Sequence, residues 1–201
     1  MTMSILRKLF FSILLISLGG CAANIKTQDI EAIQTVGVLN EFLVTANYTN
    51  IGTTIFGNKY DQVYGEGYKE HMTQTVLNYL ENKGYSVSEV TDLNDTSVDT
   101  VLYITPNSIY GMVDSNGYGF YKRTFLGTVA RNTSYVSMNI VPYVGGKSRC
   151  FGCYAKSLTK LPVVMPEKWD DLDQAQQAEF TDLLKKDIEI AVEKALKQTK
   201  L

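Results

Sequence analysis

Two amphipathic helices constrain the fold of this chain more than any other feature of its sequence. One apolar stripe recurs every four residues on a helix predicted from about residue 68 to 83, at Met72, Val76 and Leu80. A second stripe lies on a helix predicted from about residue 173 to 199, at Phe180, Leu183, Leu184, Ile188, Ala191, Val192, Ala195 and Leu196. Asp187 and its charged neighbours on that helix are expected to face water. Each stripe must be buried against another layer, so we expect both helices to cover a sheet.

Segments with strand-like patterns lie before and between these helices. They alternate or are rich in β-branched and aromatic residues, at positions 35–39, 85–90, 101–104 and 134–143. Residues 153–161 are expected to return as the partner of the last of these strands, across a turn at Gly145–Ser148. Together the segments predict an α/β (α+β) fold. It would be a two-layer sandwich, with a mostly antiparallel sheet of about five strands and the two amphipathic helices on one face.

The strongest hairpin signal in the chain is the dipeptide Asn116-Gly117, which suits the central positions of a type I′ turn. It predicts that residues 109–113 and 118–123 pair as antiparallel strands. Five aromatic residues gather around this hairpin. Tyr110, Tyr118, Phe120 and Tyr121 are the candidate partner-binding residues, and Phe125 lies beside them at the end of the predicted docking surface, residues 109–125. Adjacent side chains of a strand point to opposite faces, so at least one of these rings is expected to reach solvent and bind a partner. Packing of the same rings across neighbouring strands is the alternative.

The first twenty residues have the layout of a secretory signal peptide. The positive residues Arg7 and Lys8 come first, an apolar run from residue 9 to 16 follows, and small residues come next. The apolar run is too short to span a bilayer, which takes about 20 such residues. We therefore expect this segment to be removed from the mature protein.

The four residues Leu18-Gly19-Gly20-Cys21 at the end of that segment resemble the lipobox of bacterial lipoproteins. The resemblance implies cleavage before Cys21 and acylation of Cys21, and an ordinary signal peptide with a chance cysteine is the alternative. It also implies a signal peptide at 1–20, a lipidated N-terminus and tether at 21–34, and a single periplasmic domain at 35–201. In such lipoproteins an Asp after the cysteine tends to retain the product at the inner membrane. Ala22 stands there, so the outer membrane, facing the periplasm, is expected.

The charge balance bounds the partners of the mature chain. Lys+Arg number 19 against 21 Asp+Glu, and loss of Arg7 and Lys8 leaves 17 against 21, a net charge of −4. No basic excess is left to neutralise phosphates, which argues against nucleic acid as a partner. The same balance argues against a polybasic membrane patch, so the lipid is expected to provide the membrane contact.

The cysteine and histidine content predicts little chemistry. Cys150 and Cys153 are expected to form a structural disulfide in an oxidising compartment, with a redox-active dithiol or two free thiols as alternatives. His71 is the single histidine, so neither a metal site nor histidine-dependent catalysis is predicted, and no cofactor is expected. The run Ser157-Leu158-Thr159-Lys160 fits an S-x-x-K motif, but the companion motifs of that family are missing.

These observations favour a lipid-anchored periplasmic lipoprotein without enzymatic activity. We expect it to serve as an accessory or scaffold subunit of a cell-envelope assembly, with another envelope protein as its partner. Two alternatives from other classes remain open at this stage. One is a cell-wall or envelope hydrolase with an unrecognised site, and the other is a carrier of a small apolar ligand.

Overall fold

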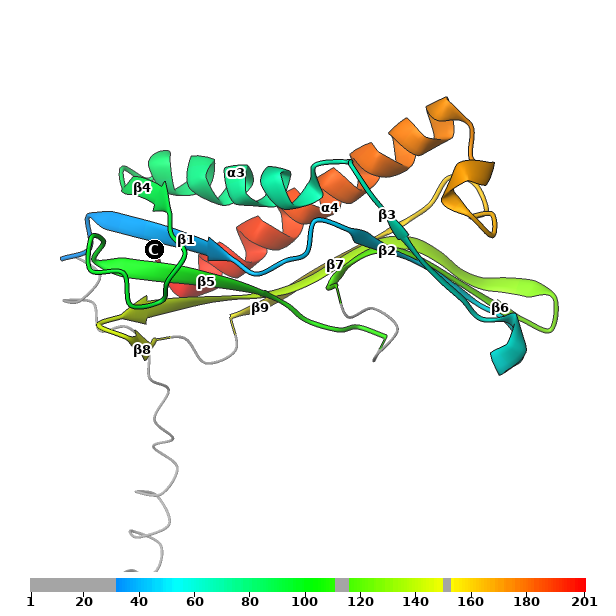
Figure 1. Ribbon diagram of the computed structural model, residues 1–201, viewed down its shortest axis with the longest axis horizontal. Helices are drawn as coiled ribbons and strands as arrows, with labels where there is room; N and C mark the ends of the chain where they lie inside the picture. Colours follow the sequence, from blue (N-terminus) through cyan, green and yellow to red (C-terminus); the bar gives the residue numbers. More distant parts are fainter. Residues whose placement is uncertain (1–31, 111–115, 150–152) are drawn as a thin grey trace, which may run out of the picture.

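The computed structural model describes residues 32–110, 116–149 and 153–201 (Figure 1). The two helices are α3 (Tyr68–Glu81) and α4 (Gln174–Thr199). The strands are β1 (Thr35–Asn40), β2 (Ala46–Ile51), β3 (Lys59–Val63), β4 (Ser86–Glu89), β5 (Thr100–Pro106), β6 (Tyr118–Phe125), β7 (Thr128–Val144), β8 (Lys147–Ser148) and β9 (Tyr154–Lys160). Two short 3-10 turns complete the described elements, η1 (Ile55–Gly57) and η3 (Trp169–Asp171).

The sheet differs from the predicted one. In the described part of the chain it is a curled, mixed sheet of nine strands in the order β3-β2-β6-β7-β5-β1-β4, with β8 and β9 also paired to β7 (Figure 1). Strand β1 runs parallel to both β4 and β5, and β2 runs parallel to β6. The prediction of a mostly antiparallel, five-stranded sandwich was therefore wrong. Local alternation marks where a strand lies, whereas the partner of each strand is chosen by contacts between distant segments.

Strand β7 is the longest strand, with 17 residues, and it pairs with four others. Val136 faces Tyr118 of β6 on one edge and Ser157 of β9 on the other, so β6 and β9 occupy opposite edges of β7. The predicted pairing of residues 153–161 with 134–143 is confirmed by the antiparallel β7–β9 ladder, and the turn at Gly145–Gly146 leads into β8.

The predicted hairpin at Asn116-Gly117 was wrong. Strand β6 lies between β2 and β7, so both of its edges are occupied and residues 109–113 have no place beside it. Residues 111–113 of that segment lie outside the described residues. The side chain of Asn116 is buried and donates to the backbone oxygen of Thr45 at 2.9 Å. The hairpin that the structure does form joins β6 to β7 through Leu126 and Gly127.

Both predicted apolar stripes are buried, as expected. Met72, Val76 and Leu80 of α3 are fully covered, and so are Phe180, Leu184, Ile188 and Leu196 of α4. Helix α3 packs on β1 and β4, while α4 packs on β7 and β9 and contacts α3 (Figure 1). A buried cluster that runs from Ile33 to Leu201 forms the hydrophobic core between the helices and the sheet.

Asp187 departs from its prediction, because it is fully buried rather than turned to water. Its carboxylate accepts hydrogen bonds from the hydroxyl groups of Ser134 at 2.6 Å, Ser157 at 2.6 Å and Thr159 at 2.8 Å. The three donors lie on β7 and β9, so this polar cluster joins α4 to two strands. Ser157, part of the S-x-x-K match, therefore serves the packing of the helix.

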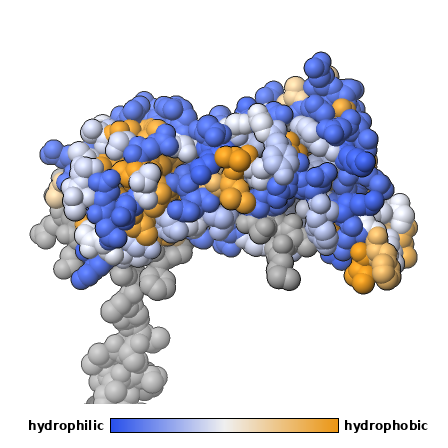
Figure 2. Space-filling model, in the orientation of Figure 1, coloured by the Kyte–Doolittle hydropathy of each residue, from blue (hydrophilic) through white to orange (hydrophobic). Residues whose placement is uncertain are grey.

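The molecule is elongated. The start of β1 and the C-terminus lie at one end, and the turns after β2 and β6 lie at the other (Figure 1). We call the end with these turns the distal end. The space-filling view shows apolar surface at this end, and further apolar patches at the other end and in the middle of the same face (Figure 2).

Candidate functional site

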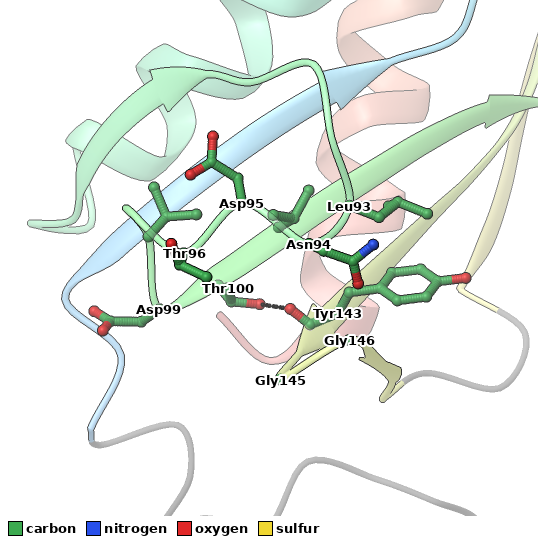
Figure 3. Close-up of a pocket in the computed structure, with 11 residues that line it drawn as sticks. Leu93, Asn94, Asp95, Thr96, Asp99, Thr100, Tyr143, Gly145 and Gly146 are labelled. Carbon is green, nitrogen blue, oxygen red and sulfur yellow. Dashed lines mark hydrogen bonds between the residues drawn. The ribbon is translucent and has the colours of Figure 1, made fainter.

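A hollow with both polar and apolar lining lies near the start of β1, at the end of the molecule away from those turns (Figure 3). It has a volume of about 360 Å³ and is lined by the β4–β5 connection together with Tyr143, Gly145 and Gly146. Its carboxylates are engaged locally. Asp99 accepts from the backbone amides of Gln34 and Thr35 at 2.9 and 2.8 Å, which lowers the pKa of its carboxyl group. Asp95 accepts from Ser97, whose hydroxyl and backbone amide likewise lower the pKa of Asp95.

That hollow is consequently a poor candidate for a cation site. Its acidic side chains stabilise the entry into β1 and the turn before β5. Among the residues that the structure describes, no group of three or more His, Cys, Asp or Glu side chains could hold a metal ion. The hydroxyl of Thr100 donates to the backbone oxygen of Tyr143 at 2.9 Å, which ties the walls of the hollow together (Figure 3).

The distal end carries the more informative surface. Two turns project there, residues 53–58 between β2 and β3 and residues 125–128 between β6 and β7. The backbone amide of Leu126 donates to the hydroxyl of Thr53 at 3.0 Å, so the two turns lie side by side. Four large apolar side chains on these turns are exposed to water: Ile55 (78%), Phe56 (91%), Phe125 (57%) and Leu126 (75%). We call this group the apolar tip.

The backbone of the β6–β7 turn is unusual for its sequence. Leu126 has φ +49° and Gly127 has φ +77°, so both turn residues lie in the left-handed region. Such a two-residue turn normally carries Asn, Asp or Gly, because a side chain with a Cβ costs about 1–2 kcal/mol in this conformation. Leu126 is disfavoured here both by its backbone and by its exposure to water. A leucine at this position therefore indicates a role that needs an apolar side chain.

Basic side chains surround the apolar tip. Lys59, Arg123 and Arg131 are exposed on the strands just behind it, and we call them the basic collar. Asp61 is the single acidic residue in positions 50–61 and 122–131 of the sequence. The ammonium group of Lys59 lies 3.7 Å from the carboxylate of Glu167, and Arg131 lies over the ring of Tyr110 at 5.5 Å.

A groove runs beside the apolar tip along β7. It has a volume of about 590 Å³ and is lined by Val129–Thr133 of β7 and by residues 160–164. The ladder between β9 and β7 begins at Thr133, so in the described part of the chain no strand pairs with this edge of β7 before that residue. We call this feature the edge groove. The amide of Leu161 still donates to the backbone oxygen of Asn132 at 3.0 Å, so the open part of this strand edge lies before Asn132.

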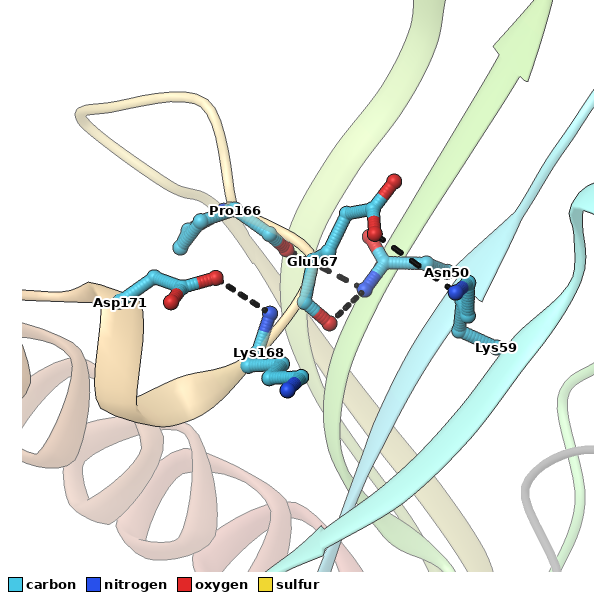
Figure 4. Close-up of polar contacts among 6 residues, drawn as sticks. All are labelled: Asn50, Lys59, Pro166, Glu167, Lys168 and Asp171. Carbon is cyan, nitrogen blue, oxygen red and sulfur yellow. Dashed lines mark hydrogen bonds and ion pairs between the residues drawn. The ribbon is translucent and has the colours of Figure 1, made fainter.

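Hydrogen bonds fix the outer wall of the edge groove. The side chain of Asn132 donates to the oxygen of Val163 at 2.7 Å and accepts from the amide of Met165 at 3.0 Å. Farther along, the side chain of Asn50 donates to the oxygens of Pro166 and Glu167 at 3.2 and 3.1 Å (Figure 4). These bonds attach the β9–α4 connection to β2 and β7, which makes the groove part of the folded frame.

The predicted aromatic partner site is not exposed as expected. Tyr118 and Phe120 are fully buried beneath the helices, where Phe120 stacks on Trp169 and Tyr118 packs on Tyr68. Burial raises the pKa of the Tyr118 hydroxyl, which donates to the backbone oxygen of Leu43. Tyr121 points to the opposite face and is buried too, because the ring of Tyr110 stacks on it at 3.8 Å. The expectation of exposure failed because both faces of β6 are covered, one by the helices and Trp169 and the other by the ring of Tyr110.

The remaining predicted sites fall partly outside the described residues. Cys21 and Cys150 both lie there, so acylation of Cys21 and the disulfide between Cys150 and Cys153 stay predictions. Cys153 itself is described and buried at the start of β9. His71 lies on α3 with its Nε2 atom 3.2 Å from the carboxylate of Glu189, where it links the two helices.

Sequence reasoning missed the apolar tip, although a signal was present. Ile55-Phe56 precedes Gly57, and Phe125-Leu126 precedes Gly127. Two adjacent large apolar residues before a glycine do not fit the alternation of a half-buried strand. This pattern is consistent with an apolar loop, but nothing in the sequence joins two segments that lie about seventy residues apart.

Comparisons with known proteins assign no family to this chain. No family model matches the sequence, and no curated protein matches it. Among solved structures, the chain is similar in its course to the crystal structure of protein XCC0632 from Xanthomonas campestris, described under family DUF330. The identity is 11%, the match covers 84% of this chain and 89% of the other, and the TM-score is 0.45. We draw no conclusion about function from this likeness. None of the helices in the described residues is long and apolar enough to cross a membrane.

Proposed function

We propose that this chain is a lipid-anchored periplasmic protein of the outer membrane that acts as a non-enzymatic accessory or scaffold subunit of a cell-envelope assembly. The signal-peptide layout and the lipobox-like residues before Cys21 support the anchoring. The edge groove supports the binding role. Its partner would be another envelope protein, which contributes an extended segment to the open edge of β7.

The open edge of β7 is the observation that carries the binding role. A free strand edge presents backbone N–H and C=O groups that an added strand can pair with, while flanking side chains select its sequence. Val129 and Val163 supply apolar walls, and Lys160 and Arg131 supply positive charge. We therefore expect a partner segment that alternates apolar residues and carries at least one acidic residue.

Site-specific photocrosslinking in intact cells tests the groove. A photoreactive residue at Ala130, which lines the groove, should capture an envelope protein through a short segment that peptide mapping locates and that has the expected alternation. The same probe at Lys156, an exposed residue of β9 outside the groove, is the matched control. The change Val164→Asp should remove the Ala130 crosslink while leaving the melting temperature nearly unchanged, because Val164 is exposed. Equal capture at both positions, or a mapped segment without this alternation, would contradict the proposal.

Intact-mass measurement of membrane-extracted protein tests the anchoring separately. The mature chain should begin at Cys21 and carry acyl chains, and an unmodified N-terminus at another residue would end that part of the proposal. Alkylation of the denatured protein without reductant tests the predicted disulfide, since Cys150 and Cys153 should not react even when the burial of Cys153 is removed. Neither result bears on the groove, so the two parts of the proposal fail independently.

A further inference from the structure

We propose that the apolar tip inserts into the surface of a phospholipid bilayer that contains anionic lipid. The apolar residues involved lie on the two distal turns, whereas the edge groove lies along β7. Arg131 belongs to both surfaces, but the apolar tip itself lies outside the groove, so this inference does not depend on the function proposed above. It rests on the shape of the tip, on the backbone of one turn and on the charges behind it.

The shape of the tip fits a fluid surface better than a protein pocket. Its side chains stand on two adjacent turns at the extreme end of the molecule, and Phe56 is 91% exposed (Figure 2). A protein partner would need a matching hollow for each protruding side chain. A bilayer needs none, because lipids rearrange around an apolar group that enters the boundary between headgroups and acyl chains. Exposed apolar clusters on soluble domains commonly mark interaction surfaces of this kind.

The β6–β7 turn supports the same interpretation. Asn or Gly at position 126 would remove the backbone strain of the left-handed conformation, and any polar residue there would remove the cost of exposing an apolar side chain to water. The hydrogen bond from its amide to Thr53 holds Leu126 beside the turn that bears Ile55 and Phe56. The structure thus assembles apolar side chains from two distant segments at a position where packing within the chain does not use them.

The charges behind the tip are complementary to anionic headgroups. Lys59, Arg123 and Arg131 are exposed on the strands that lead into the two turns. The acidic residues beside them are Asp61 and Glu167, whose carboxylate lies 3.7 Å from the ammonium group of Lys59, so three basic residues stand against two acidic ones. The whole chain has a net charge of −2, so this local excess of positive charge is not a property of the surface in general. Basic residues next to an inserted apolar group meet headgroup phosphates, and they are attracted to a leaflet that contains anionic lipid. We therefore name a bilayer with anionic lipid as the occupant.

Depth-dependent quenching of tryptophan fluorescence tests the proposal on the full-length protein. The change Phe56→Trp places a probe at the tip, and Leu43→Trp places one at an exposed position in the connection between β1 and β2. Each protein is reconstituted with vesicles of phosphatidylcholine, with and without phosphatidylglycerol, whose acyl chains carry bromine. The native Trp169 contributes the same background fluorescence to both variants, and the unchanged protein is measured alongside to determine it.

We expect bromine to quench the tryptophan at position 56 on vesicles that contain phosphatidylglycerol, and to leave the one at position 43 at the level of the background. Adding Leu126→Ser to the Phe56→Trp protein should reduce this quenching. Adding Arg123→Gln and Arg131→Gln instead should make the quenching equal on vesicles with and without phosphatidylglycerol. Equal quenching at positions 43 and 56 would overturn the proposal. So would quenching at position 56 that appears only when envelope proteins are added, because the tip would then bind a protein.

Discussion

The buried carboxylate of Asp187 offers the sharpest test of how this fold is stabilised. The change Asp187→Ala removes the acceptor for three hydroxyl groups that β7 and β9 direct at α4. The three hydroxyl groups would then face a site that is closed to solvent, since Asp187 is fully buried. A buried donor without a partner costs its desolvation energy, whereas the lost hydrogen bond by itself costs less.

The cost differs among the three hydroxyl groups. Ser157 is buried and donates to no other acceptor in the part of the chain that the structure describes, so leaving its hydroxyl group unpaired should cost about 2 kcal/mol. The hydroxyl of Ser134 lies 3.4 Å from a second acceptor, the backbone oxygen of Thr159, and the hydroxyl of Thr159 is on a half-buried residue. Losing the carboxylate should therefore cost about 1 kcal/mol at each of these two hydroxyl groups. The total is about 4 kcal/mol, which corresponds to a fall in melting temperature of roughly 8–16 °C for a domain of this size.

Asp187→Asn is the matched control. Its amide oxygen can accept from Ser157 and Thr159, and its NH₂ group can donate to Ser134, so the loss should stay near 1 kcal/mol. Chemical denaturation of the three proteins measures the difference in the free energy of unfolding. A double-mutant cycle with Ser157→Ala sharpens it, because removing this hydroxyl should destabilise the wild type and cost almost nothing in the Asp187→Ala background. If Asp187→Ala and Asp187→Asn lose the same stability, the argument from unpaired hydroxyl groups is wrong.

Three further changes test other parts of the structure. Gly119→Ala should lower the free energy of unfolding by more than about 3 kcal/mol, because the new Cβ would lie 2.1 Å from the backbone oxygen of Asn47, at φ +147°. Gly127→Ala is the comparison, because its Cβ would meet no atom within 4 Å and the change should cost about 1 kcal/mol. Chemical denaturation of both variants measures the difference. Asn132→Ala removes two hydrogen bonds to the outer wall of the edge groove, so it should cost about 2 kcal/mol and speed limited proteolysis after residue 161; an unchanged cleavage rate would contradict this. The pKa of Asp99 is lowered from its ordinary value of 3.8, so the ionised carboxylate stabilises the fold above that pH, and this stabilisation is lost as the pH falls. The difference in melting temperature between the wild type and Asp99→Asn should therefore become smaller below about pH 4. A difference that grows below this pH would refute the assignment.

The sequence by itself determined the features that depend on neighbouring residues. The periods of the two stripes located α3 and α4, and Asp173, which accepts from the amide of Gln176, marks the start of α4 with a capping box. The β7–β9 pairing followed from a short connection with a glycine turn, since such segments pair with their neighbours in the chain. These predictions needed only hydrogen bonds and side-chain periods that span a few residues.

Tertiary structure decided which strands pair in parallel. The parallel pairing of β2 with β6 joins residues about seventy positions apart, and no local pattern specifies it. That pairing makes β6 an internal strand of the sheet. There the helices and Trp169 cover Tyr118 and Phe120 on one face and the ring of Tyr110 covers Tyr121 on the other, so the suggested docking surface is buried. The β2–β6 pairing also brings the turn after β2 beside the turn after β6, and so creates the apolar tip.

Charge shows the same division between sequence and structure. The sequence gives a net charge of −2 and placed Asp187 among water-facing residues of α4. The fold instead buries this carboxylate under three hydroxyl groups and gathers Lys59, Arg123 and Arg131 at the distal end. Net charge is a sum over the chain and carries no positions, whereas an electrostatic surface depends on which residues become neighbours in space. Those neighbours are set by the pairing of distant strands, which only the folded chain fixes.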